Sequence, residues 1–226
     1  MANKYVIRFS KTGYVKYTSH LDLLRMFKRA FKKAELGLAY SQGFNPHPKM
    51  GFAQPLSLGY AGRNELIEFE TDRPHQTAEI LRAMQGKMPQ GIEISACYEL
   101  SPKVKSLAAA ADSAEYRIWI LTEKSEPQLQ EDLKKYLLQD EILAMKRMKK
   151  TKKEEPVNIK NMIRRVEISK AGDFAVLEAL LDCGSQSNCS PELVIASFCA
   201  FAQISTPRNM IEVERRNINF VNKLQF

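Results

Sequence analysis

Two kinds of apolar spacing alternate along the 226 residues of the chain, and the same order of spacings occurs twice. Residues 4–10 alternate apolar and polar side chains, which is typical of a half-buried strand, and residues 19–35 then have the spacing of an amphipathic helix. The other strand or helix segments of this half are residues 52–59, 64–71, 74–87 and 92–100. The order βαββαβ predicts a ferredoxin-like unit over residues 1–100, in which two helices lie on one face of an antiparallel sheet.

The second half of the chain follows residues 101–114, whose Ser, Pro and small side chains predict a linker. After it the strand and helix spacings return in the same order, at residues 115–121, 126–139, 142–148, 174–182, 191–202 and 210–216. A lysine-rich turn and an extended stretch lie between the third and fourth of these segments. We therefore predict an α+β protein of two tandem ferredoxin-like units, the second of which covers residues 115–226 and carries a lysine-rich hairpin.

Positive charge is concentrated in two blocks of the chain. Lys and Arg number 34 against 26 Asp and Glu, which gives a formal charge of +8. Residues 1–50 hold ten basic and two acidic side chains, and residues 143–165 hold nine and two. Such blocks favour a localised anionic partner, of which nucleic acid is the commonest kind, although a surface that is only solvated remains the alternative.

The first basic block includes the helix predicted over residues 19–35. On a helical wheel its apolar side chains, among them Leu23, Phe27 and Phe31, share one arc, and Ser19 is placed to cap the first turn. Five cations occupy the opposite arc, namely Arg25, Lys28, Arg29, Lys32 and Lys33. We predict that this face binds nucleic acid, and the alternative is a helix whose cations only keep the protein soluble.

A turn-rich loop follows this helix and carries side chains that are unusual for a plain connection. Gly43, Pro46 and Pro48 restrict its backbone and allow a ligand to approach closely. The nucleic-acid-binding side chains predicted here are Phe44, Asn45, His47 and Lys49. Candidate platforms for stacking RNA bases are Tyr14, Tyr17, Tyr40 and Phe44. We expect His20, at the start of the helix, to share one pocket with the loop residues from Phe44 to Lys49.

The second basic block has six cations within eight residues, at Lys146, Arg147, Lys149, Lys150, Lys152 and Lys153. Strand alternation distributes them over both faces of the predicted hairpin, so they cannot form one flat patch. We predict that they also bind nucleic acid, and the alternative is an unrelated solvated loop.

The run YTSHLDLLRMFKRAFKKAELGLAYSQGFNPHPKMGFAQPLSLGY, from Tyr17 to Tyr60, carries a family resemblance. It resembles the bacterial family described as domain of unknown function 2344, whose members are called radical-SAM-associated or radical-SAM-linked proteins. The resemblance implies a protein that acts beside a separate radical S-adenosylmethionine (radical SAM) enzyme, and it implies no established activity. The chain has no C-x-x-x-C-x-x-C motif to hold an iron–sulfur cluster, so the radical chemistry would belong to that partner.

We therefore predict an RNA-binding accessory protein that works with a radical SAM enzyme in RNA or ribosome-related modification. An accessory role is favoured over an enzymatic activity of the chain itself. The expected RNA is structured. The chain itself is expected to hold no cofactor and no metal, because its cysteines and histidines lack the usual ligand spacing. The cysteines, Cys97, Cys183, Cys189 and Cys199, are expected to be reduced thiols that are buried or inert. No long apolar run is present, which predicts a cytoplasmic protein without a membrane partner.

Two alternatives to this function stay open. A metal-independent ribonuclease would use His20, His47, Tyr17 and Lys49 for proton transfer and charge stabilisation. A scaffold that recognises a protein substrate for the radical SAM enzyme is the other alternative.

Overall fold

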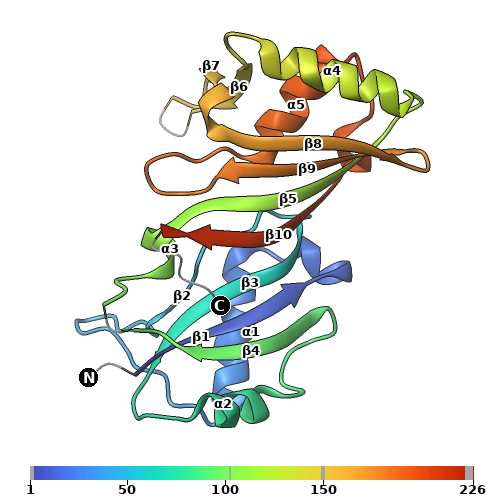
Figure 1. Ribbon diagram of the computed structural model, residues 1–226. Coiled ribbons are helices and arrows are strands. Elements are labelled where there is room, and N and C mark those ends of the chain that lie inside the picture. The colour runs from blue at the N-terminus through green and yellow to red at the C-terminus, as the bar shows by residue number, and fades with distance from the viewer. Residues whose placement is uncertain (1–2, 102, 149–150, 222–225) are drawn as a thin grey trace. The chain divides into compact units, whose positions relative to one another are not determined.

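The computed structural model describes residues 3–101, 103–148, 151–221 and 226 of the chain (Figure 1). Contacts divide the chain into two units, which are Met1–Asp112 with Arg215–Phe226, and Ser113–Glu214. Residues 115–226 are predicted to form the second unit, whereas the contacts group Arg215–Phe226 with the first. Helices accompany antiparallel strands in both units, so the class is α+β.

The first unit begins with β1 (Asn3–Lys11), the 3₁₀ helix η1 (Gly13–Tyr17) and α1 (His20–Lys33). After them come β2 (Met50–Phe52), β3 (Ala61–Thr71), α2 (Thr77–Met84), β4 (Ile92–Glu99) and the short helix α3 (Leu107–Ala110). β1 lies between β4 and β3, with Ile7 opposite both Cys97 and Ile67, and β2 pairs with β3. Up to β4, the helices and strands therefore follow one another in the predicted order.

α1 is the element that the sequence predicts best. Ser19 caps it, since the Ser19 hydroxyl accepts a hydrogen bond from the Asp22 N–H at 3.2 Å. The buried face is apolar as expected, and the Phe27 ring lies 4.9 Å from that of Phe9 on β1. Figure 1 shows α1, in blue, behind the strands β1, β3 and β4. The basic face of α1 is therefore turned away from this core.

The strand predicted over residues 52–59 is wrong for most of its length. β2 ends at Phe52. Beyond it, Pro55 has no N–H to give to a neighbouring strand, and Gly59 has a φ of 83°, which a strand does not accept. Residues 53–60 form an irregular segment instead, in which the Gly59 N–H donates to the Lys16 carbonyl at 2.9 Å.

The predicted linker over residues 101–114 contains a packed helix. In α3, Leu107 is fully buried in a cluster with Val6, Leu66 and Phe220. Ser106 caps this helix by accepting a hydrogen bond from the Ala109 N–H at 3.1 Å. A four-residue helix is too short to show an apolar period, so apolar spacing did not predict its packing.

A Schellman motif ends α1 and reverses the chain. The Glu35 N–H donates to the Lys32 carbonyl at 3.2 Å, and the Leu36 N–H donates to the Phe31 carbonyl at 3.1 Å. Glu35 therefore takes a φ of 55°, in the left-handed region that favours glycine. Leu36 is buried beside Phe31 in the same core cluster, and this contact fixes the path of the chain after the helix.

Replacing Glu35 with glycine is expected to stabilise the protein by about 0.5–1 kcal/mol. Glycine has no Cβ to strain a left-handed residue, and this gain exceeds its larger entropy in the unfolded chain. Urea unfolding of the Glu35→Gly variant measures the change. Lys134→Gly, at a regular helical residue, is the control and should lose about 1 kcal/mol. Equal losses in both variants would contradict a strained Glu35.

The second unit begins at Ser113, within β5 (Ala111–Leu121), and continues with α4 (Glu126–Leu138). Its later elements are β6 (Leu143–Arg147), β7 (Glu154–Asn158), the 3₁₀ helix η2 (Lys160–Met162), β8 (Ile163–Ala171), β9 (Phe174–Asp182), α5 (Pro191–Phe201) and the 3₁₀ helix η3 (Arg208–Met210). The last strand, β10 (Glu212–Phe220), runs across the division between the units. In this unit β9 lies between β5 and β8, and Tyr136 of α4 packs on Phe198 of α5 at 5.4 Å.

The hairpin β6–β7 differs from the prediction for residues 142–148. β6 pairs with β7 in a separate two-stranded sheet, with Lys146 opposite Glu155 and Arg147 opposite Glu154. The segment that joins the larger sheet beside β9 is β8 instead. Alternation predicted that residues 142–148 form a strand, but it could not identify the neighbour of that strand.

The four cysteines are free and buried, as the sequence predicts. Burial raises the pKa of the Cys97 and Cys189 thiols to about 12 and that of the Cys199 thiol to about 11. We expect the native thiols to react with an aromatic disulfide reagent at pH 8 about 100-fold more slowly than in denaturant, because the thiolate is the nucleophile. A cysteine that reacts at the denatured rate in the folded protein would contradict this.

Candidate nucleic-acid interface

The cations of α1 form one exposed face. Arg25, Lys28, Arg29, Lys32 and Lys33 are all exposed to solvent. Arg25 donates to the Asp22 carboxylate at 2.8 Å. Hydrogen bonds from Ser19 and from Arg25 lower the pKa of Asp22, so this carboxylate stays charged and offsets Arg25. In the part of the chain that the structure describes, no hydrogen bond or ion pair engages the side-chain ammonium group of Lys28, Lys32 or Lys33. These cations are therefore available for an external anion.

A groove lies beside this face and combines charge with an apolar floor. It has a volume of about 550 Å³. Its lining consists of Lys28, Arg29, Lys32, Glu35, Leu36, Gly37, Leu38 and Tyr40. Three cations and one carboxylate form the charged part, whereas Leu36 is buried and Tyr40 exposes 47% of its surface. The groove is hereafter called the Tyr40 groove.

The chain reversal after α1 builds the Tyr40 groove. Following the Schellman motif, the chain returns along β3, where the Ala39 N–H donates to the Glu70 carbonyl at 2.8 Å. The Lys49 N–H in turn donates to the Ala39 carbonyl at 2.8 Å, and Tyr40 bridges Pro48. Residues 38–40 are thereby held between two backbone segments, so Tyr40 has a fixed place opposite α1.

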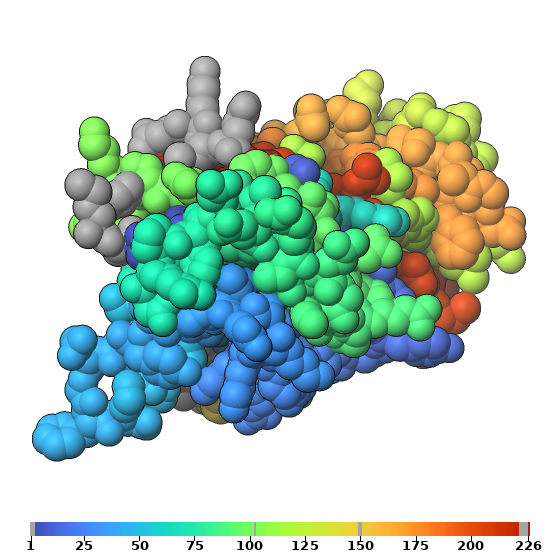
Figure 2. Space-filling model, turned by 90° about the horizontal axis from the view of Figure 1, so that it is seen from below, coloured from blue at the N-terminus to red at the C-terminus, as the bar shows by residue number. Residues whose placement is uncertain are grey.

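The predicted single pocket of His20 and the loop residues is wrong. Residues 40–48 project from the molecule in Figure 2, where they form the light-blue arm at the lower left. Phe44 at their tip is fully exposed, and Asn45 and His47 are exposed as well. Backbone hydrogen bonds from Lys49 to Ala39 and from Ser41 to His47 pair the two ends of this segment, so residues 42–46 form the turn that connects them.

Of the four residues proposed for a ribonuclease, His20, His47 and Lys49 lie in separate places. The His20 ring packs edge-on against the Phe52 ring, with 5.3 Å between the ring centroids. Both side chains line a small pocket at the start of α1. Lys49 lines another pocket and donates to the Glu70 carboxylate at 2.8 Å. His47 lies on the exposed arm, and Tyr17 is exposed beside Lys16. Because general acid and base must both reach one phosphate, this arrangement does not favour cleavage by these four residues.

A buried charged cluster, which the sequence pattern did not predict, lies beside His20. Lys11, Glu65 and Arg215 expose at most 3% of their surfaces. Arg215 donates to both Glu65 carboxylate oxygens, at 2.8 and 2.6 Å, and to the Gln54 carbonyl at 2.8 Å. Lys11 donates to the Thr18 carbonyl at 3.0 Å. Burial lowers the pKa of Lys11, while the Glu65 carboxylate opposes that effect.

A sequence signal for this cluster existed. Along β1 the residues Tyr5, Ile7 and Phe9 face the core, and Lys11 continues the same alternation. On β3, Glu65 likewise precedes Ile67 and Phe69. A Cβ on Gly62 would lie 2.5 Å from the Glu65 side chain, so this glycine makes room for the carboxylate. Charges at core positions therefore marked these residues, whereas their pairing with Arg215, 150 residues away, needed the structure.

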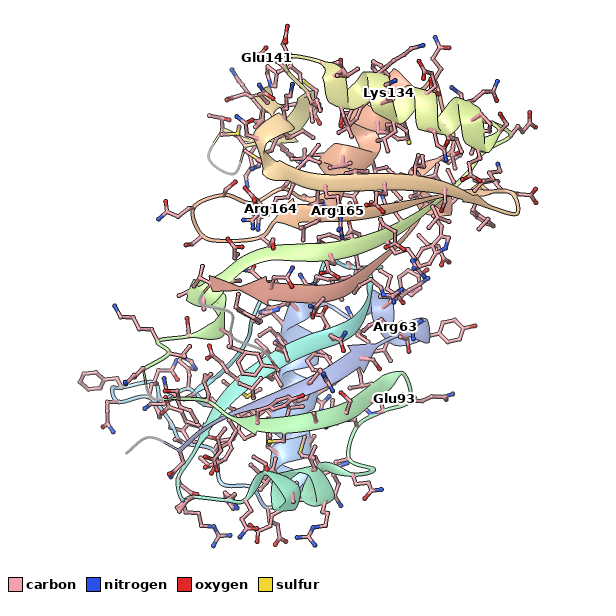
Figure 3. The ribbon with its side chains drawn as sticks, viewed as in Figure 1. Arg63, Glu93, Lys134, Glu141, Arg164 and Arg165 are labelled. Atoms are coloured by element: carbon pink, nitrogen blue, oxygen red, sulfur yellow. The ribbon has the colours of Figure 1, made fainter. Side chains whose placement is uncertain are left out.

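The second basic block lies on the β6–β7 hairpin of the second unit. Lys146, Arg147, Lys152 and Lys153 are exposed, and Lys149 and Lys150 lie outside the described residues. The neighbouring arginines are labelled on β8 in Figure 3. Arg164 pairs with Asp182 at 2.6 Å, and Arg165 lies 3.7 Å from Glu167. The exposed hairpin cations thus form a second candidate contact for an anionic ligand.

Across the described ranges, no group of three or more His, Cys, Asp or Glu side chains is arranged to hold a metal ion. None of the helices that the structure describes combines the length and the apolar character needed to cross a membrane.

Comparisons with known proteins identify a family but no activity. A family model described as "Uncharacterized protein conserved in bacteria (DUF2344)" matches residues 4–191. A search of curated proteins gives no match.

Solved structures show a likeness in fold. A chain from the "Crystal Structure of a Cbf5-Nop10-Gar1 Complex" matches with a TM-score of 0.52 and 12% identity. The match covers 95% of this chain and 49% of that chain, so this protein spans about half the length of that relative. A protein titled "Crystal Structure of an Unknown Protein from Galdieria sulphuraria" aligns over 95% of this chain and 99% of that chain, with 11% identity and a TM-score of only 0.27.

Proposed function

We propose that this chain, which belongs to the DUF2344 family, is an RNA-binding accessory protein that works with a radical SAM enzyme in RNA or ribosome-related modification. The observation that carries RNA binding is the exposed cationic face of α1, together with the Tyr40 groove beside it. Family membership supports the idea of a partner only through the resemblance described above.

The cations of α1 that lack an ion-pair partner among the described residues lie close together, and this density of charge favours RNA as the ligand. Lys32 lies four residues after Lys28 and three after Arg29, so its Cβ atom is about 5–6 Å from the Cβ atom of each on the helix surface. Holding several cations so close together costs electrostatic free energy, which a polyanion removes by replacing its own bound counterions. A single carboxylate ligand would engage one or two of these cations and leave the others unneutralised.

A salt titration tests RNA binding. The purified chain is mixed with a fluorescent RNA hairpin, and binding is followed by fluorescence anisotropy between 50 and about 200 mM salt. We expect log K to fall linearly with log salt, with a slope of about −0.7 to −0.9 for each phosphate contacted. No binding at 50 mM salt, by a protein with a native circular dichroism spectrum, would contradict the proposed function.

The finer fold assignment is also part of the proposal. We infer that both units are ferredoxin-like and occur in tandem. The order β4, β1, β3 with β2 on the far side of β3 supports this for the first unit, and the order β5, β9, β8 supports it for the second. An experimental structure tests it, and a second unit in which β8 and β9 lie apart would contradict it.

The partner is tested by affinity capture of the tagged chain from its own cells, with and without ribonuclease. Co-purification of a radical SAM enzyme in both samples would support a direct complex. RNA captured without such an enzyme would favour simple RNA binding, and the enzyme captured without RNA would favour the protein-substrate scaffold.

A further inference from the structure

We infer that the Tyr40 groove binds an unpaired RNA base, which stacks on Tyr40 while its flanking phosphates contact Lys28, Arg29 and Lys32. This inference rests on the proposed RNA binding and assigns its ligand more closely. The target would be single-stranded RNA or a bulged nucleotide within a structured RNA.

The groove has the two surfaces that a nucleotide needs. Leu36 and Leu38 form an apolar floor, and the Tyr40 ring is half-exposed above it. Among the described residues, no hydrogen bond engages the Tyr40 hydroxyl. An aromatic ring of this kind contributes stacking with any base, since every base has a π face. The volume of about 550 Å³ is within the range of small-molecule sites.

The charges of the groove specify the rest of the ligand. Lys28, Arg29 and Lys32 stand on the α1 side, and Glu35 is the one carboxylate of the lining. The groove is therefore positive beside an apolar surface, which matches a nucleotide with its planar base and anionic phosphates. A continuous duplex keeps its bases inside the stack and would offer phosphates alone, so it would leave Tyr40 and the apolar floor unused.

The position of Tyr40 is set before any ligand binds. The Ala39 backbone is hydrogen-bonded to Glu70 and to Lys49, on either side of it. Tyr40 also bridges Pro48. A ring held in this way loses little conformational entropy when a base binds. Ordering of the loop therefore offsets little of the free energy of stacking.

The test compares two RNA hairpins of the same stem, one fully paired and one with a single bulged 2-aminopurine. Both are measured by anisotropy with the wild-type chain and with Tyr40→Ala, Tyr40→Phe and Phe174→Ala. Phe174 is the matched control, because it is 39% exposed, belongs to the second unit and does not line the groove. Circular dichroism establishes that each variant is folded.

We expect the wild-type chain to prefer the bulged hairpin and to quench the 2-aminopurine fluorescence. Tyr40→Ala should lose about tenfold in affinity for the bulged hairpin, with little change for the paired one, and should lose the quenching. Tyr40→Phe and Phe174→Ala should behave like the wild-type chain. A Tyr40→Ala variant that does not fold is replaced by Tyr40→Leu, which keeps the apolar bulk and removes the ring.

The outcomes separate this inference from the proposed function. If the wild-type chain binds neither hairpin, the proposed function fails. If it binds both equally, or if Tyr40→Ala retains the preference and the quenching, RNA binding stands and the base site is overturned. Displacement of the bulged hairpin by an equal concentration of polyglutamate would overturn it as well, because an acidic peptide would then be the better ligand.

Discussion

Replacing Lys28, Arg29, Lys32 and Lys33 with glutamine will weaken binding of a structured RNA at low salt by about 2 kcal/mol or more, roughly 30-fold. All four are exposed on α1, and Lys28, Arg29 and Lys32 also line the Tyr40 groove. Removing their charges removes the counterion release that drives binding, so the salt slope should become shallower by about one for each phosphate that the variant no longer neutralises. Anisotropy titrations at several salt concentrations measure both quantities.

A charge-matched variant makes this prediction specific to α1. Arg82, Lys87, Lys103 and Lys134 are exposed and lie outside both basic blocks. Replacing these four with glutamine changes the net charge equally and should reduce affinity much less. An equal loss in both quadruple variants would mean that net charge alone, and not this helix face, determines the affinity.

The substitution Glu65→Gln is expected to destabilise the fold by about 3–5 kcal/mol. Glu65 accepts two hydrogen bonds from Arg215 and is the carboxylate beside buried Lys11. Glutamine keeps the shape but removes the charge, so two buried cations lose the same counter-charge. The midpoint and slope of urea unfolding measure the loss.

Two further variants serve as controls for the stability loss in Glu65→Gln. Glu93→Gln removes an exposed carboxylate on β4, labelled in Figure 3, and should change the stability by no more than about 0.5 kcal/mol. The triple replacement Lys11→Met, Glu65→Leu and Arg215→Met removes all three buried charges and should cost less than Glu65→Gln alone. A loss below about 1 kcal/mol in Glu65→Gln would show that other groups balance the buried cations.

The candidate interface was predictable where it depended on one helix. The five cations of α1 and its apolar face follow from the 3.6-residue period, and Ser19 is a local capping signal. The Tyr40 groove was not predictable in this way. Tyr40 was one of four candidate stacking residues, and only the reversal at Glu35 places it opposite Lys28 and Lys32.

The sequence by itself determined the class of the protein, the order of most helices and strands, and the concentration of positive charge, because periodicity, capping and charge are local properties. The tertiary structure decided which strand neighbours β6, where the arm around Phe44 points and which groups meet Glu65. These depend on hydrogen bonds and burial between segments far apart in the chain. Apolar spacing indicates that a segment is buried, but it does not specify the partner that buries it.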